Sequence, residues 1–334
     1  LCRKCAPRGD GHFPMTRLRA GTAIFCMGDI VPDVIIPYGQ AKHAQAALQQ
    51  GKVVECSPRL RPGGAVANTA AVLGKLGAAP YFLGGTGSDE YGDYLCDYLR
   101  GCGVHTEYLF RQKEHTSLML AVLDADGDRS IFSFNGPNAK LPQLEPQHLP
   151  QSLIPKIGWL HTNGFANDAM IDFFAQCAAR GVLCSFDLNL RCETYGLDAA
   201  RRARVLRAVE ASAVVFGSGA EEFAPLTGIS DLHRAAGSLA TETRIVVARD
   251  GTSPVHLFAD GASAVIPVPS VRVVNSVGGG DAFNAGFIAA YASGRSAAEA
   301  VRWGNCCAGF AIASDRPHNV PNAATIERTV AATE

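Results

Sequence analysis

The stretch 275–287 holds the residues with the clearest chemical potential, N-S-V-G-G-G-D-A-F-N-A-G-F. In it Gly278, Gly279 and Gly280 lead directly into a carboxylate, Asp281, at which we expect a helix to begin. The free N–H groups and the positive end of a helix start bind anionic groups such as phosphate. A carboxylate beside them could accept the proton of an attacking hydroxyl. The pattern is typical of phosphoryl transfer; the structural alternative is that Asp281 only caps its helix.

A second glycine pair, Gly63 and Gly64, precedes a predicted helix over 65–76. Small residues recur on one face of this helix, which would let it pack closely against a sheet. Because the first N–H groups of a helix have no acceptor within it, we expect those after the glycine pair to be open to a ligand.

Two common nucleotide-binding motifs are absent from the sequence. The Gly-Lys pairs at 51–52 and 74–75 are followed by Val and Leu, not by the Ser or Thr of a P-loop. No G-x-G-x-x-G opens a helix after the first predicted strand, which argues against a nicotinamide-dependent dehydrogenase. No lysine follows Lys156, so any phosphate bound by the C-terminal half would contact arginine and backbone N–H groups rather than lysine.

Strand and helix patterns alternate along most of the chain. We expect a buried strand over 23–27, and short apolar runs alternate with helical patterns from 157 to 248. This alternation predicts an α/β fold with a mainly parallel sheet. The segment 34–60 is irregular and polar, and 117–134 has the pattern of a hairpin, so both are expected to lie outside the core.

Composition limits the classes of protein to be considered. The 334 residues are 47% hydrophobic and 18% charged, as in globular proteins. A net charge of -1 gives no field for nucleic acid or an anionic membrane, and no run approaches the roughly 20 apolar residues of a membrane span. A small-molecule partner is therefore expected.

The N-terminal residues have a different character from the rest. Residues 1–14 lack the apolar core of a signal peptide, and we expect 1–17 to be a disordered or tag-like extension, the natural chain starting near Met15, with 18–334 forming a single domain. Cys2 and Cys5 lack partners at zinc-binding spacing, so they are interpreted as incidental thiols. The eleven cysteines are scattered rather than dense, which favours a reducing cytoplasm.

Taken together, these motifs resemble the ribokinase-like (PfkB) family of carbohydrate kinases from about Ala23 to Pro321. The matching stretches are G-G-A-V-A-N from Gly63 with L-G at 76–77, G-x-G-x-D-x-x-G at 85–92, D-x-N-x-R at 187–191, and the G-G-G-D stretch. The resemblance implies a Rossmann-like three-layer core and a small β-sheet lid, here about 34–62 and 107–136. In the family this lid often forms the dimer contact, so a homodimer is expected.

The resemblance also implies roles for individual residues on the substrate side. Asp281 would be the general base, beside an anion hole formed by the three glycines. Asp33 and Asn68, with Gly63 and Gly64, would bind sugar hydroxyls, which carboxylate and amide groups can hold in pairs. The structural alternatives are a surface carboxylate for Asp33 and a helix N-terminal cap for Asn68.

Arg191 has two interpretations within the same resemblance. It would contact either a substrate carboxylate or the transferred phosphoryl group, or else form a structural ion pair with Asp187.

On the nucleotide side the chain departs from the family pattern. Gly219 replaces the Asn of N-x-x-E, which leaves Glu222 to support Mg²⁺ through water. Arg249 and Gly251 lie in an altered T-x-G-x-x-G loop, and Asn305 resembles a position near adenine, with a structural role on its helix as the alternative.

Two further substitutions bear on potassium and on the substrate. Asn275 replaces an acidic residue that helps to hold a monovalent cation, so dependence on K⁺ is doubtful. Kinases of sugar phosphates keep a lysine where this chain has Ala65, which favours an unphosphorylated substrate.

The resulting prediction is an ATP- and Mg²⁺-dependent kinase of a sugar hydroxymethyl group, of the fructokinase, 2-keto-3-deoxygluconate kinase or ribokinase type. The alternatives are a nucleoside kinase of the same fold and a non-catalytic sugar or nucleoside sensor.

Overall fold

The computed structural model describes residues 18, 22–37, 55–113, 115–123, 129–134, 144–316 and 318–332. The extension expected over 1–17, including the Cys2 and Cys5 pair, lies outside the described residues. So does much of the first expected lid segment.

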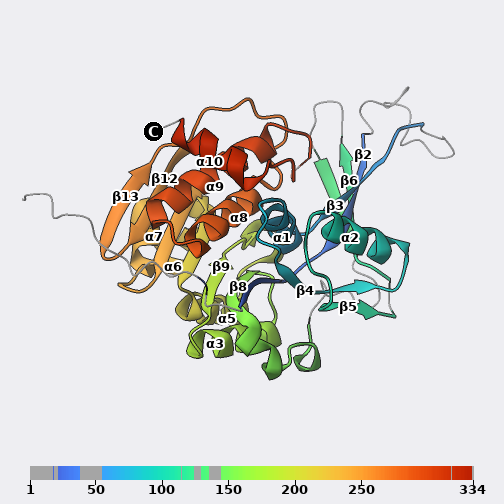
Figure 1. Cartoon of the computed structure of the whole chain (residues 1–334), viewed down its shortest axis with the longest axis horizontal. Coiled ribbons are helices and arrows are strands. Elements are labelled where there is room, and N and C mark those ends of the chain that lie inside the picture. Colours follow the sequence, from blue (N-terminus) through green and yellow to red (C-terminus); the bar gives the residue numbers. More distant parts are fainter. Residues whose placement is uncertain are drawn as a thin grey trace, which may run out of the picture.

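A nine-stranded sheet forms the centre of the molecule (Figure 1). In spatial order its strands are β13 (Ala262–Ile266), β12 (Ser253–Ala259), β11 (Ile245–Asp250), β10 (Val214–Ser218), β9 (Leu183–Asp187), β8 (Ile157–Asn163), β1 (Ala23–Met27), β4 (Tyr81–Gly87) and β5 (Leu109–Gln112). Neighbouring strands from β11 to β5 are parallel, whereas β12 and β13 form an antiparallel hairpin at one end. The predicted mainly parallel sheet is therefore confirmed.

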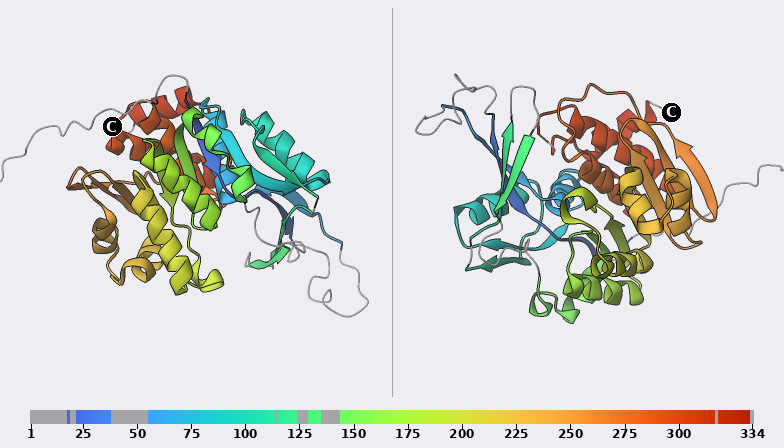
Figure 2. Two further views of the ribbon diagram at one scale, coloured as in Figure 1. Left: turned by 90° about the horizontal axis from the view of Figure 1, so that it is seen from below. Right: turned by 180° about the vertical axis from the view of Figure 1, so that it is seen from behind.

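Helices cover both faces of this sheet (Figure 2). One face is packed by α1 (Ala65–Lys75), α2 (Glu90–Gly101), α8 (Gly279–Ala292), α9 (Ala297–Ile312) and α10 (Ala323–Ala331). The other is packed by α3 (Asp168–Ala179), α5 (Ala199–Ala211), α6 (Gly219–Thr227) and α7 (Leu232–Leu239). Three short helical segments, η3 (Pro146–His148), η4 (Gln151–Lys156) and α4 (Cys192–Tyr195), complete the core.

Strand β1 shows why both faces need helices. Its side chains alternate, with Ile24 and Cys26 in the apolar cluster on the α1 side and Phe25 and Met27 in the cluster on the α3 side. Alternate residues of a strand point to opposite faces. A central strand buried on both faces therefore appears in the sequence as the continuous apolar run 23–27.

A separate four-stranded sheet projects beside the core (Figure 1). Its order is β3 (Arg59–Gly63), β2 (Val31–Ile36), β6 (Leu118–Leu123) and β7 (Arg129–Phe134). The expected hairpin is confirmed as the antiparallel pair β6 and β7. The described ends of the segment 34–60 lie outside the core sheet, as expected, and form the antiparallel pair of β2 and β3. We refer to this unit as the small sheet.

The described residues also bear on two expectations from composition. The nine cysteines among them are all free thiols. In the same part of the chain, no helix combines the length and the apolar character needed to cross a bilayer.

Candidate active site

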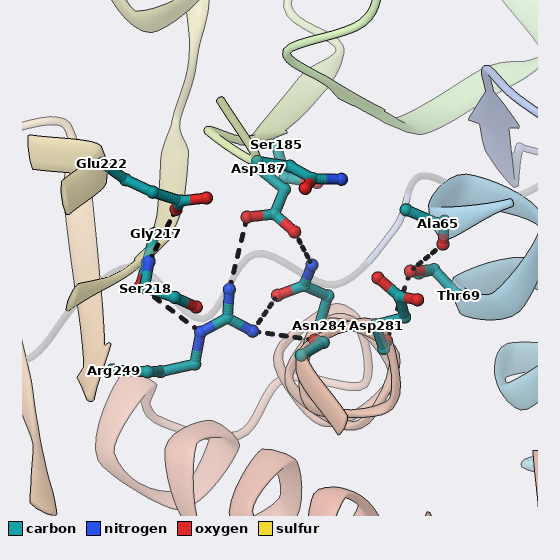
Figure 3. A network of polar contacts seen from close by, with 12 residues as sticks. Ala65, Thr69, Ser185, Asp187, Gly217, Ser218, Glu222, Arg249, Asp281 and Asn284 are labelled. Carbon is teal, nitrogen blue, oxygen red and sulfur yellow. Dashed lines mark hydrogen bonds and ion pairs between the residues drawn. The ribbon is translucent and has the colours of Figure 1, made fainter. Parts of the chain in front are cut away.

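Polar side chains gather where the parallel strands end. Asp29 follows β1, Asn163 ends β8 and Asp187 ends β9. Helix α1 begins beside Asp29, and Asn284 of α8 contacts Asp187 (Figure 3). Ligands of open α/β sheets bind at the carboxyl ends of the strands, where the order of the strands reverses. Here β1 lies between β8 and β4, so the chain leaves β1 at such a point.

Asp281 lies in the first turn of α8. The helix begins at Gly279 with Gly278 as its N-cap, so both the predicted start at Asp281 and the capping alternative are wrong. The Nδ2 group of Asn68 donates a hydrogen bond of 2.7 Å to Asp281 Oδ2. Thr69 Oγ1 lies 3.2 Å from the Asp281 carbonyl oxygen, which joins α1 to α8 beside the carboxylate (Figure 3).

The surroundings of Asp281 change its basicity. Burial raises the pKa of Asp281 to about 7, with further increases from the charges of Asp187 and Asp29. The hydrogen bond from Asn68 and the charge of Arg249 act in the opposite direction. A carboxylate with a pKa near neutrality suits a general base, because it is substantially ionised at working pH and still basic enough to take a proton.

The three glycines before Asp281 lie where a side chain would be strained or crowded. Gly278 has φ of 79°, which favours glycine. A Cβ atom on Gly279 would lie 2.7 Å from Ile312 Cγ2, and one on Gly280 would lie 3.3 Å from Arg249 Nη1. The first-turn N–H groups of α8 have no acceptor within the helix, and that of Gly279 lies 3.4 Å from the Ser276 carbonyl.

The predicted sugar-binding residues are brought together between the small sheet and α1. A Cβ atom on Gly63 would lie 2.4 Å from Asp33 Oδ2, so the half-buried Asp33 carboxylate lies directly over this glycine. Asn68 is the fourth residue of α1 and its amide contacts Asp281, so the alternative of a helix cap is wrong. Gly64 is the N-cap, with φ of 96°.

The N–H groups at the start of α1 are not open to a ligand as the sequence had suggested. Asp29 Oδ2 accepts a hydrogen bond of 2.7 Å from the Ala65 amide, and Asp29 Oδ1 accepts one of 3.3 Å from the Val66 amide. Asn163 Nδ2 also donates to Asp29 Oδ1, at 3.1 Å. Sequence reasoning did not single out Asp29 as a functional residue; its signal was an acidic residue just after a buried strand.

A buried network of ion pairs and hydrogen bonds lies beside residues 278–280, which we call the glycine turn (Figure 3). The Arg249 guanidinium donates from Nη1 to the Gly280 carbonyl at 2.8 Å and to Asn284 Oδ1 at 2.9 Å. Its Nη2 lies 3.3 Å from Asp187 Oδ1, and Asn284 Nδ2 donates to Asp187 Oδ2 at 2.8 Å. The cation also lies 5.1 Å from the Phe283 ring centre. The contacts of Arg249 are thus internal, and the nucleotide contact expected of it stays a prediction.

Glu222 joins two loops at the same edge. Its Oε2 accepts from the Ser218 amide at 2.7 Å, and its Oε1 accepts from the Leu190 amide at 3.2 Å. Burial, followed by the charge of Asp187, raises the pKa of Glu222 to about 7. No group of three His, Cys, Asp or Glu side chains in the described residues is placed to bind a metal directly. Each Glu222 oxygen keeps lone-pair capacity, which fits Mg²⁺ held through its own waters.

The remaining predicted residues lie around this edge. Arg191 is exposed, has φ of 44°, and donates from Nε to Asn189 Oδ1 at 3.3 Å. Asp187 forms its ion pair with Arg249 instead. The alternative of an ion pair between Arg191 and Asp187 is therefore not observed. Gly251, with φ of 53°, makes the turn after β11. The nucleotide role of Gly251 stays a prediction.

Asn305 lies on α9 and is buried. Its Nδ2 group donates to the Pro267 carbonyl at 3.1 Å, which agrees with the structural alternative for this residue. A contact with adenine stays a prediction.

Comparisons with protein families, with sequences and with solved structures all find carbohydrate kinases. The model of the pfkB family carbohydrate kinases matches residues 22–322. Fructokinase-2 of Oryza sativa subsp. japonica is 26% identical over 339 residues, covering 96% of each chain. The crystal structure of fructokinase with bound ATP from Xylella fastidiosa superposes with a TM-score of 0.77 at 21% identity, covering 94% of this chain and 99% of that one. Fructokinase from Vibrio cholerae O395, in a form with fructose, ADP and calcium, gives 0.74 at 24% identity, covering 93% and 100%.

Proposed function

Since this chain belongs to the pfkB family of carbohydrate kinases, we propose that it transfers the γ-phosphoryl group of ATP to a hydroxymethyl group of an unphosphorylated sugar. One observation carries the proposal: Asp281, whose pKa is raised to about 7, lies at the glycine-rich start of α8 and is hydrogen-bonded by Asn68. An anion-binding helix start and a base near neutrality are the two groups that the reaction needs side by side.

In the proposed reaction the substrate hydroxyl oxygen attacks the γ-phosphorus of ATP. Its proton passes to a carboxylate oxygen of Asp281, and the bond between the γ-phosphorus and the bridging oxygen breaks, so that ADP leaves. Of the three glycines, Gly278 and Gly280 are the proposed N–H donors to the negative charge on the transferred phosphoryl oxygens, because the Gly279 N–H lies 3.4 Å from the Ser276 carbonyl. Asn68 holds the carboxylate in place from the α1 side.

The sugar would be held between the small sheet and α1. Asp33 and Asn68 offer a carboxylate and an amide for paired hydroxyls, beside the loop of Gly63 and Gly64. The next residue, Ala65, begins α1. Its uncharged side chain could not pair with a phosphate group already present on the sugar. Fructose is the first substrate to test, because the relatives reported above are named as fructokinases.

The nucleotide would lie on the other side of α8. Gly251 and Asn305 are the proposed neighbours of ATP, and Arg191 the residue that would reach the phosphoryl group or an acidic substrate. Mg²⁺ would be held through water by Glu222 and, when bound, would neutralise phosphate charge. K⁺ is not part of the proposal, because Asn275 is an uncharged amide that accepts a hydrogen bond from the Val277 amide.

We also propose that the small sheet acts as a lid and forms a homodimer in the cytoplasm. It carries large apolar side chains that are exposed in the monomer, Leu60 at 42% and Phe132 at 58%. Covering such side chains favours association. Analytical ultracentrifugation of the protein and of Phe132→Asp tests this, with a monomeric wild-type protein as the contradicting result.

An ADP-release assay with Mg-ATP tests the function. Fructose, other free sugars, keto-deoxy sugar acids and nucleosides form the panel, and Asp281→Asn is the control. We expect one sugar to be turned over strongly, and the variant to lose about 10²–10⁴-fold in kcat while still binding that sugar in a thermal-shift assay. Unchanged turnover in the variant would overturn the role of Asp281. Sugar binding without any ATP consumption by the wild type would favour a sensor.

A further inference from the structure

A chain of hydrogen bonds continues from Asp281 through Asn68 to two side chains that the mechanism above does not use. Asn68 Oδ1 lies 2.5 Å from Nε2 of His318. The Nδ1 atom of the same histidine lies 2.6 Å from the hydroxyl of Tyr98. His318 follows α9 and Tyr98 belongs to α2, so the chain joins three separate parts of the fold to the start of α8.

The direction of each hydrogen bond follows from the chemistry of its members. An ionised Asp281 can only accept, so the NH₂ group of Asn68 faces it and the amide oxygen of Asn68 faces His318. That oxygen requires a proton on Nε2 of His318. Nδ1 of a neutral imidazole is then an acceptor, and the Tyr98 hydroxyl donates to it.

The surroundings keep His318 neutral. The side chain is buried, with 4% of its surface exposed, and burial followed by the charge of Lys75 lowers the pKa of His318 to about 3. Lys75 Nζ, from α1, also donates to the His318 carbonyl at 2.5 Å. A small hollow, lined on its apolar side by Ile30, Ala67 and Leu99, lies against these polar groups.

We propose that His318, oriented by Tyr98, is a positioning residue for catalysis: it fixes the Asn68 amide so that its NH₂ group faces the carboxylate of Asp281. This inference rests on the proposed role of Asp281 as the base. Without His318 the Asn68 amide could rotate and place its oxygen against the carboxylate. The base would then lose a hydrogen bond that favours its ionised form.

The pH profile of kcat/KM for the sugar tests the proposal, because its acidic limb reports the base of the free enzyme. The charged groups that face Asp281 are Asp187 from β9, Asp29 after β1 and Arg249 from β11, and none of them is changed by substitutions at 318. In His318→Leu we expect the acidic limb to move up by about one pH unit. Because the pKa of Asp281 is about 7, the ionised fraction of the base, and kcat/KM with it, should then fall about fivefold at pH 7.

Three further variants separate positioning from folding. His318→Gln can donate to Asn68 and accept from Tyr98, so it should restore most of the wild-type profile. Tyr98→Phe should show a smaller shift in the same direction as His318→Leu. Leu99→Ala shortens a buried side chain that lines the same hollow but takes no part in the hydrogen bonds from Asp281 to Tyr98. It should therefore lower the melting temperature and leave the acidic limb of the pH profile in place.

Nitrogen-15 NMR of labelled histidine gives a readout that needs no activity. We expect His318 to keep its proton on Nε2 from pH 5 to 9, and the Nδ1 signal to move in Tyr98→Phe. A protonated Nδ1, or a profile in His318→Leu that matches that of Leu99→Ala, would overturn the inference while leaving the proposed function intact. If the wild type has no kinase activity, the proposed function fails, and the NMR result alone decides whether the hydrogen-bond chain exists.

Discussion

Asp281 and Arg249 lie beside the same helical turn with opposite charges and different roles. The carboxylate faces α1 and the edge of the sheet, whereas the guanidinium is enclosed between β9, β11 and α8 (Figure 3). If Asp281 is the base, as proposed, its carboxylate must keep access to substrate and so cannot be fully paired within the protein. A buried cation has no such need, and every contact described for Arg249 serves to hold neighbouring groups in position.

The raised pKa of Asp281 predicts a pH-dependent stability difference. In the unfolded chain an aspartate titrates near 3.9, whereas in the folded protein the pKa of Asp281 is about 7. Between these values the folded state binds more protons, so this residue lowers stability as pH rises. We therefore expect the melting temperature of Asp281→Asn, relative to wild type, to increase from pH 5 to pH 8.

Differential scanning calorimetry at several pH values would measure this difference. Asp97→Asn is the matched control for the loss of one carboxylate, since the Asp97 side chain is 77% exposed. A difference for Asp281→Asn that changes with pH no more than that of the control would contradict the raised pKa.

Replacement of Arg249 should be costly for stability. Arg249→Met would leave Asp187 buried without its cation, and breaking a buried pair in this way costs about 3–5 kcal/mol. Arg295→Met is a matched control, because Arg295 also pairs with a carboxylate, that of Glu327, and lies 4.5 Å from an aromatic ring centre, but at the surface. There we expect a loss of about 1 kcal/mol or less. Urea unfolding measures both, and equal losses would contradict a special role for the buried network.

At the scale of elements, the sequence predicted those helices and strands whose own residues have a clear hydrophobic pattern. Helix α1 was expected over 65–76 and α8 was expected to begin at Asp281, and both expectations lie within two residues of the observed bounds. Helix α6 was not predicted, because Pro225 interrupts its pattern. Strands β2 and β3 contain proline and charged residues, and their pairing with each other supplies the order that their own sequence does not indicate.

The candidate site likewise has one part that local sequence predicts and one part that depends on tertiary contacts. The glycine turn and its carboxylate are contiguous, so the motif alone located them. The bonds of Asp29 to the start of α1, of Arg249 to Asp187 and of His318 to Asn68 join residues far apart in the chain. Each partner is selected by the tertiary fold, and a single sequence holds no pattern for such pairs.

The loop between β3 and α1 gives a prediction about substrate affinity. A Cβ atom at Gly63 would lie 2.4 Å from Asp33 Oδ2, so Gly63→Ala must displace that carboxylate. If Asp33 binds the sugar, KM for the sugar should rise about tenfold, since a charged hydrogen bond contributes about 1.5–3 kcal/mol, while kcat changes little.

Steady-state kinetics with the preferred sugar would measure this effect. Gly101→Ala, at the end of α2, is the matched control, because no atom lies within 4 Å of the added Cβ, and its kinetics should equal those of wild type. A rise in KM that is the same in both variants would count against the sugar-binding role of Asp33.

At the scale of the whole molecule, the small sheet is tied to the core by charge. Arg61 of β3 donates to the carbonyl and, at 3.0 Å, to the carboxylate of Asp315, and Arg59 lies 3.9 Å from the same carboxylate. Asp315 follows α9, in the same segment as His318. The position of the proposed lid is therefore linked to the segment that orients the Asn68 amide.

This link predicts a salt-dependent affinity for sugar. In Asp315→Ala we expect KM to rise up to about fivefold at low ionic strength, the upper range for an exposed ion pair. Because salt screens exposed charges, the two proteins should converge near 0.5 M NaCl. Parallel curves of KM against salt concentration would show that the ion pair does not affect the lid.

The hydrogen bond between Asn68 and Asp281 has a consequence for synthesis of the protein. Its two residues are 213 positions apart, so at usual rates of translation roughly 10 to 40 seconds separate their emergence from the ribosome. During that interval the apolar face of α1 lacks the cover of α8. The nascent chain therefore carries an exposed apolar helix face, and the Asn68 amide has no carboxylate partner in place, until α8 has been made.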